Sequence, residues 1–134
     1  MAALGTKLRT LEGGRVAFWC PGCGEAHQIM VSRDATPDGP CWGFNGDGDC
    51  PTFTPSILVR GVRIDGGDAE IERIIDTYQL PEDRERMLAD RRINTVCHSF
   101  VTKGRILFLQ DCTHPLAGQT VDLPDFPIGA RDDH

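Results

Sequence analysis

The stretch VCHSFVTKGRILFLQDCTH, residues 96–114, decides the fold. It carries one cysteine–histidine pair before Lys103-Gly104 and a second pair after it. The apolar runs that flank this Gly-containing dipeptide predict a β-hairpin with a two-residue loop. In that register Cys97 faces Gln110, and Cys112 lies diagonally opposite Cys97 on the same face. The two thiols are therefore predicted to point the same way.

The same alternation separates the first histidine from its neighbouring cysteine. His98 faces Leu109 and lies with Asp111 on the opposite face of the hairpin. A three-residue loop beginning at Thr102 would reverse this parity and place His98 beside Cys112. Both strands are apolar on both faces, so the length of this turn decides which side chains meet.

The sequence CPGCG, residues 20–24, follows the apolar run RVAFW and is the strongest chemical signal in the chain. A Cys-x-x-Cys turn with Pro and Gly lets two thiolates converge on one cation while backbone N–H groups point at the sulfurs. A redox Cys-x-x-Cys is the competing interpretation, but the βαβ pattern that would support it is missing. We therefore predict a zinc knuckle at Cys20 and Cys23.

The predicted zinc is structural, with four thiolates that close it to water. Its predicted ligands are Cys20, Cys23, Cys97 and Cys112. In the alternative, His27, His98 or His114 replaces one cysteine. Such a site would join the knuckle to the hairpin and stabilise a small domain. Cys41 and Cys50 are predicted to be idle thiols, with a second metal site or a disulfide as the alternatives.

The remaining polar residues suggest nucleophilic hydrolysis, in which a histidine takes a serine proton and a carboxylate fixes the histidine tautomer. Ser56 is the predicted nucleophile, with His98 or His114 as the base. Asp111 would orient the base, and His27 is a further candidate catalytic residue. The competing interpretation is that these are ordinary hydrogen-bonded turn and strand residues. Metal catalysis would instead need the three histidines to form an open site.

The predicted fold class is α+β and mostly β: a small antiparallel sheet with a zinc knuckle and one or two short helices. Pro81, the acids after it and the closing arginines predict a helix over 81–92. Residues 69–80 suit a helix or a strand, and the spacing of their isoleucines favours a helix. Strands are predicted over Arg15–Trp19, His27–Val31, Ile57–Ile64, Thr95–Val101 and Arg105–Gln110.

The length of 134 residues fits one zinc-stapled domain, 1–134, with a core over about 15–124 and an irregular tail over 125–134. The net charge of −6 argues against nucleic-acid and membrane-surface partners, because those reward clustered Lys and Arg. The sequence shows no signal peptide and no membrane span, which predicts a soluble, cytoplasmic protein. Six cysteines in such a protein are better explained as metal ligands or free thiols than as disulfides.

The motifs CPGCGEAH, FNG just after Trp42, PTFTPSI, CHSF and DCTHPLAGQTVDLP follow one another over about Phe18 to Pro124. Together they resemble an uncharacterised family of small phage and prophage proteins that sometimes carries the label ammonia monooxygenase. More distant relatives are found in bacterial ubiquitin-like conjugation operons, which implies a hydrolase acting on a ubiquitin-like tail. A thiol-rich domain without a membrane span offers nothing for the monooxygenase chemistry. The family motifs fall on Cys20, Cys23, His27, Ser56, Cys97, His98, Asp111, Cys112 and His114.

Two functions follow from these features. The first is a hydrolase with a structural zinc, of the peptidase or isopeptidase type, whose substrate is a protein, with a ubiquitin-like protein as one candidate. The second is a non-enzymatic zinc-binding phage accessory protein, carried in the host cytoplasm or in the virion, that binds another protein. Its binding surface would be framed by Trp42, Phe44 and Phe53.

Overall fold

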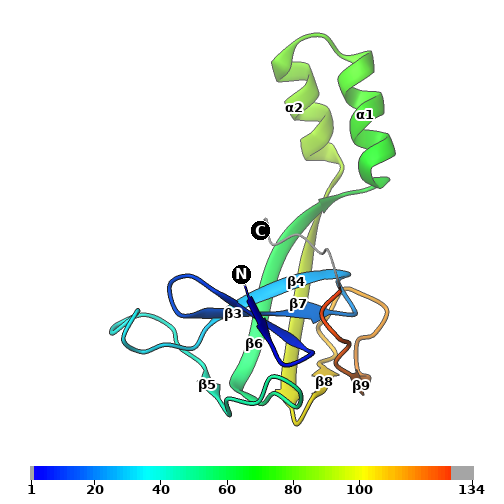
Figure 1. The fold of residues 1–134 in the computed structure, drawn as a ribbon. Coiled ribbons are helices and arrows are strands. Elements are labelled where there is room, and N and C mark those ends of the chain that lie inside the picture. The colour runs from blue at the N-terminus through cyan, green and yellow to red at the C-terminus, as the bar shows by residue number, and fades with distance from the viewer. Residues whose placement is uncertain (1, 128–134) are drawn as a thin grey trace. The chain divides into compact units, whose positions relative to one another are not determined.

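The computed structural model describes residues 2–127, which contain two helices and nine strands (Figure 1). These residues divide into two compact units, one formed by the chain up to Val59 together with the chain from Cys97 onward, the other by Arg60–Val96. In chain order the elements are β1 (Ala2–Leu4), β2 (Leu8–Leu11), β3 (Arg15–Cys20), β4 (Glu25–Met30), β5 (Gly43–Phe44), β6 (Phe53–Ile64), α1 (Gly67–Thr77), α2 (Pro81–Asp90), β7 (Arg92–Thr102), β8 (Arg105–Phe108) and β9 (Thr120–Asp122).

The predicted fold class is confirmed, because the chain is mostly β with antiparallel pairing and two short helices. Strands β1 to β4 form a four-stranded sheet in chain order, and β5 to β9 form a five-stranded sheet, also in chain order. The sequence predicted one sheet, whereas the structure has two. The short strands β1, β2, β5 and β9 were not predicted.

The β7–β8 hairpin has the predicted two-residue loop. Thr102 pairs with Arg105, which leaves Lys103 and Gly104 as the loop. Both loop residues have positive φ, 50° and 78°, as the turn that matches the twist of a hairpin requires. The side-chain parity of the hairpin therefore follows the first of the two predicted registers.

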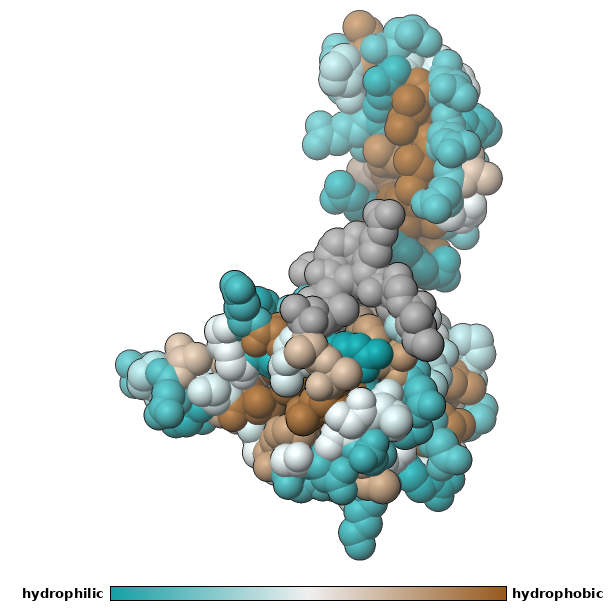
Figure 2. Space-filling view, in the orientation of Figure 1, coloured by the Kyte–Doolittle hydropathy of each residue, from teal (hydrophilic) through white to brown (hydrophobic). Residues whose placement is uncertain are grey.

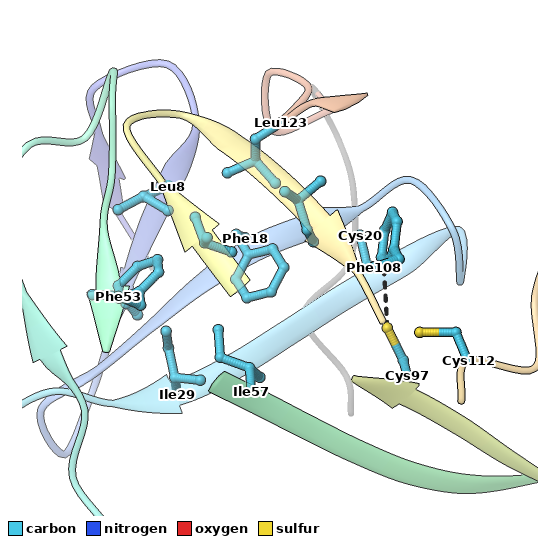
Figure 3. Packing of buried hydrophobic residues seen from close by; sticks show 13 residues of the cluster. Leu8, Phe18, Cys20, Ile29, Phe53, Ile57, Cys97, Phe108, Cys112 and Leu123 are labelled. Carbon is cyan, nitrogen blue, oxygen red and sulfur yellow. Dashed lines mark hydrogen bonds between the residues drawn. The ribbon is translucent and has the colours of Figure 1, made fainter. Parts of the chain in front are cut away.

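The core of the first unit contains apolar side chains of both sheets, which point toward one another (Figure 3). Phe18 of β3 stacks on Phe53 of β6 with the ring centroids 6.2 Å apart. A smaller cluster contains Phe126, which packs edge-on against Trp19. Buried Leu8 and Phe126 show that the core begins before residue 15 and continues past residue 124. The tail over Asp125–Pro127 is irregular, and the rest of the predicted tail lies outside the described residues.

The second unit consists of the far parts of β6 and β7 and the two helices. Helix α2 confirms the helix expected over 81–92, with Pro81 at its first position, and α1 confirms the helical choice for 69–80. Ile74 is the buried residue of α1, and Figure 2 shows apolar residues in a strip along the helical pair. No helix within residues 2–127 is long and apolar enough to cross a membrane.

Candidate functional site

Three side chains from separate segments of the first unit form a hydrogen-bonded chain. Ser56 is on β6, His98 is on β7, and Asp111 follows β8. The Oγ atom of Ser56 lies 2.9 Å from Nε2 of His98, and Nδ1 of His98 lies 3.2 Å from a carboxylate oxygen of Asp111. This is the order of contacts by which a carboxylate orients a histidine and the histidine takes a proton from a serine hydroxyl.

The chain of contacts is open to solvent at its acidic end. The side chain of His98 is 26% exposed and that of Asp111 is 56% exposed. The Asp111 carboxylate can accept a hydrogen bond from a neutral His98 only when the imidazole proton is on Nδ1. Nε2 of His98 is then free to accept the Ser56 hydroxyl proton.

Trp42 fixes the backbone of the serine. Its indole N–H donates to the carbonyl oxygen of Ser56 over 3.1 Å, and its own backbone N–H donates to the carbonyl oxygen of Met30 over 2.8 Å. Met30 ends β4, so Trp42 links the strand carrying Ser56 to the four-stranded sheet. This role of Trp42 was not predicted from the sequence.

Cys112 fixes the backbone of the histidine. The backbone N–H of His98 donates to the sulfur of Cys112 over 3.2 Å, and the thiol donates to the carbonyl oxygen of His98 over the same distance. That carbonyl oxygen also accepts the N–H of Leu109 at 2.9 Å. A buried thiol therefore holds both backbone polar groups of the candidate base.

The opposite side of β7 carries a cluster of cysteines. The ligand atoms of Cys20, Cys23, His27 and Cys97 all lie within 4.8 Å of one another and could hold a metal ion. Figure 3 shows the 3.8 Å contact between the sulfurs of Cys20 and Cys97. In the knuckle the N–H of Cys23 points at the sulfur of Cys20 over 3.4 Å, as in a zinc-binding turn.

The three sulfurs of this cluster compete for protons. Hydrogen bonds from the Cys23 and Cys97 thiols hold the pKa of Cys20 far below its ordinary value. The same contacts act in reverse on the donors: the hydrogen bond to Cys20 raises the pKa of Cys23 to about 12 and raises that of Cys97 well above its usual range. Negative charge on one sulfur disfavours charge on the others, so three thiolates need a cation between them.

A second group of possible ligands shares Cys97 with the first. It contains Cys97, Cys112 and His114. Nε2 of His114 lies 3.5 Å from the sulfur of Cys97, and the ring packs edge-on against Phe108 with the centroids 4.4 Å apart. The His114 ring also contacts Gly22 of the knuckle so closely that a Cβ there would lie 2.3 Å from it.

His27 is the buried histidine of the cluster. It is 4% exposed and packs edge-on against Phe18 with the ring centroids 5.5 Å apart. Within the described part of the chain its Nε2 atom is buried without a hydrogen-bond partner, as is Oγ of Ser99. A buried polar nitrogen without a partner is costly, and a bound metal ion would satisfy it.

The predicted residues thus separate into two sets. Ser56, His98 and Asp111 come together, whereas His27 and His114, also considered as catalytic residues, lie in the cysteine groups. The three histidines form no shared ligand group within residues 2–127. The four-ligand group contains His27 where the all-cysteine set had Cys112, which is one of the alternatives left open by the sequence.

Cys41 and Cys50 belong to neither ligand group, and both are free thiols. The disulfide considered between them is therefore absent from the structure.

The expected binding surface of Trp42, Phe44 and Phe53 is wrong. Phe53 is only 1% exposed, and the rings of Phe44 and Phe53 stack with their centroids 5.0 Å apart. Trp42 and Phe44 are partly buried and pack against the same core. Aromatic residues near Gly and Asp look exposed in the sequence, but here they close the end of the core.

A Ser-His-Asp chain on a β scaffold is the type of site that serine hydrolases use. In a comparison with protein families, residues 5–109 match the family described as bacterial ubiquitination-like system serine protease (BubE). The matched residues cover most of the chain, and the protein belongs to this family. They include Ser56 and His98 and end two residues before Asp111.

No curated protein and no solved structure matches the chain. The family description confirms the expected connection to a bacterial ubiquitin-like system. It names neither a phage nor zinc, so the phage origin and the identity of the metal stay predictions.

Proposed function

We propose that this protein is a serine protease that cleaves the bond after the C-terminal tail of a ubiquitin-like protein. The observation that carries the proposal is the Ser56–His98–Asp111 chain, with contacts of 2.9 Å and 3.2 Å in the order that the chemistry requires. The family description supports a protein substrate from a ubiquitin-like system.

In the proposed reaction the Oγ atom of Ser56 attacks the carbonyl carbon of the scissile bond while Nε2 of His98 takes the hydroxyl proton. Asp111 stabilises the positive charge that forms on His98. The leaving amine or hydroxyl departs with the proton from His98, and the substrate acyl group remains as an ester on Ser56. Water then attacks the ester with His98 as the base, which releases the acid and restores the serine.

The outer face of the sheet supports an extended peptide as the substrate. Leu58 lies two residues from Ser56 along β6, and Phe100 lies two residues from His98 along β7, so alternation places each on the face of its neighbour. Leu107 pairs with Phe100 across the hairpin. These three apolar side chains are 38 to 45% exposed, and they offer contacts on the same surface as the serine.

We further propose that the metal is zinc and that its role is structural. Three cysteines and a histidine are a preferred donor set for zinc, which would supply the positive charge that lets the thiols ionise together. Cys20, His27 and Cys97 are buried and Cys23 is exposed. A zinc ion held by four protein ligands keeps no open position for a substrate, so such a site stabilises the fold. Reduced thiols are also consistent with a cytoplasmic location.

The test is cleavage of a ubiquitin-like protein that carries a C-terminal extension, with and without Ser56. We expect Ser56→Ala to lower the cleavage rate by about 10⁴ to 10⁶-fold, because no other group replaces the nucleophile. Zinc content and melting temperature should stay unchanged. Ser32→Ala, a partly buried serine after β4, is the matched control and should cleave normally.

A fluorophosphonate probe gives a second measurement that needs no knowledge of the substrate. It should label the wild type and Ser32→Ala at Ser56 and should leave Ser56→Ala unlabelled. Cleavage at the wild-type rate by Ser56→Ala would overturn the proposal.

A further inference from the structure

Three candidates compete to be the fourth ligand beside the thiols of Cys20, Cys23 and Cys97. Zinc–sulfur bonds of about 2.3 Å and a tetrahedral angle separate two sulfurs by about 3.8 Å. The sulfurs of Cys20 and Cys97 are 3.8 Å apart. The candidates for the fourth position are His27, Cys112 and His114, and the hydrogen-bond partners of each decide between them.

The thiol of Cys112 is already engaged in hydrogen bonds with the backbone of His98. Its thiol donates a proton to the carbonyl oxygen of His98 and accepts the N–H of the same residue, each over 3.2 Å. A cysteine ligates zinc as the thiolate, which has no proton to donate. Ligation by Cys112 would break its bond to the carbonyl of His98.

His114 has the wrong tautomer for ligation. Its Nδ1 accepts the backbone N–H of Leu116 over 3.2 Å, so Nδ1 carries the lone pair. A neutral imidazole then has its proton on Nε2, the atom that faces the sulfur of Cys97 at 3.5 Å. A protonated nitrogen cannot bind a metal, but it can donate a hydrogen bond to a thiolate.

His27 meets the requirements that the others do not. In the β3–β4 pairing Phe18 faces His27 and Cys20 faces Glu25, so Cys20 and His27 are diagonal neighbours on one face. An imidazole nitrogen of His27 lies within 4.8 Å of all three sulfurs. His27 is only 4% exposed, and its Nε2 atom has no hydrogen-bond partner among residues 2–127.

We infer that Cys20, Cys23, His27 and Cys97 hold the zinc, and that His114 donates its Nε2–H to the Cys97 thiolate. His114 is then a positioning residue outside the ligand set, and Cys112 supports His98 rather than the metal. The inference rests on the zinc part of the proposed function. It is independent of whether Ser56 is the nucleophile.

The ligand set can be read from the wild-type protein after exchange of its metal for ¹¹³Cd. Scalar coupling between cadmium and protons should connect the metal to the Hβ atoms of three cysteines and to the ring of His27. Coupling to the ring of His114 or to the Hβ atoms of Cys112 would overturn the inference. A protein that takes up neither zinc nor cadmium would overturn it too, while leaving the Ser56→Ala result unaffected.

Variants at the two histidines separate ligand from donor. Zinc affinity, measured by competition with a chromophoric chelator, should fall by more than about 100-fold in His27→Ala and by about 10 to 100-fold in His114→Phe. His114→Gln keeps an N–H donor and should recover part of the affinity lost in His114→Phe. Cys112→Ser should bind zinc as the wild type does. A larger loss in His114→Phe than in His27→Ala would contradict the assignment.

Discussion

The two faces of β7 place different chemistry on adjacent residues. Cys97 is 3% exposed and faces a cluster of thiols, whereas the side chain of the next residue, His98, is 26% exposed and contacts Ser56. After β8 the same division recurs, with Asp111 exposed and Cys112 buried. Strand β7 therefore contributes a residue to each site, and alternation along it keeps the ligand Cys97 away from the catalytic groups.

The exposed face of β7 depends on the buried face for its folding. The cysteine cluster joins segments that are far apart in the sequence, since Cys20 and Cys97 are 77 residues apart. The catalytic chain adds little packing, because Asp111 is exposed and its contact with His98 is screened by water. Substitutions in the cysteine cluster should therefore remove both metal binding and cleavage, and substitutions in the catalytic chain should remove only cleavage.

Metal removal should have the largest effect. Structural zinc sites contribute up to about 10 to 16 kcal/mol in small domains, so chelation should unfold much of the protein and abolish cleavage. Thermal unfolding followed by circular dichroism, with and without chelator, measures this loss. Cys41→Ser and Cys50→Ser should behave as the wild type, because neither cysteine belongs to a ligand group. An unchanged melting temperature after complete metal removal would show that the cluster does not stabilise the fold.

Asp111→Asn should have an intermediate effect that is confined to the exposed face. An amide at this position cannot balance the charge on His98 and can favour the wrong tautomer, which costs about 10⁴-fold where the carboxylate is buried. Because Asp111 is 56% exposed, we expect a smaller fall in kcat, of about 10² to 10³-fold. Steady-state kinetics on the ubiquitin-like fusion measures this fall, and zinc content should not change.

Asp122→Asn is the matched control, because Asp122 is an exposed aspartate of the same unit whose partner is Arg105. It should leave kcat unchanged. An equal loss of activity in both variants would mean that a general change of surface charge is responsible. A loss of zinc in Asp111→Asn would contradict the separation of the two faces.

The hairpin parity could be predicted because it depends only on local information. Lys103-Gly104 is a turn that the dipeptide itself favours, and alternation then assigns every side chain beyond it. The two helices were also predictable, since a leading proline and the spacing of apolar residues are local signals. Strands of two to four residues, such as β5 and β9, give no periodicity long enough to detect.

The candidate site was predictable in its residue types but not in its distances. Ser56 and His98 are 42 residues apart, and their contact depends on how β6 pairs with β7 across an inserted helical pair. His27 is different, because a signal for it was present. A turn at CPGCG makes β3 and β4 a hairpin, and counting back from the turn puts His27 on the face of Cys20.

Cys112→Ala should have the smallest effect, and it acts at the boundary between the two faces. The thiol is the hydrogen-bond partner of both the N–H and the carbonyl of His98. Its loss leaves a backbone N–H without that acceptor, which costs about 1 to 3 kcal/mol of stability when the group is buried. We expect a fall in kcat of about tenfold as His98 loses part of its support.

Zinc content separates this role of Cys112 from ligation. If Cys112 only supports His98, Cys112→Ala should retain one zinc per chain, and Cys112→Ser should recover much of the activity because a hydroxyl also donates and accepts. If Cys112 were a ligand instead, both variants would lose zinc and lower the melting temperature as chelation does. Comparison of kcat with zinc content in these two variants therefore tests whether the buried thiol serves the exposed face of β7.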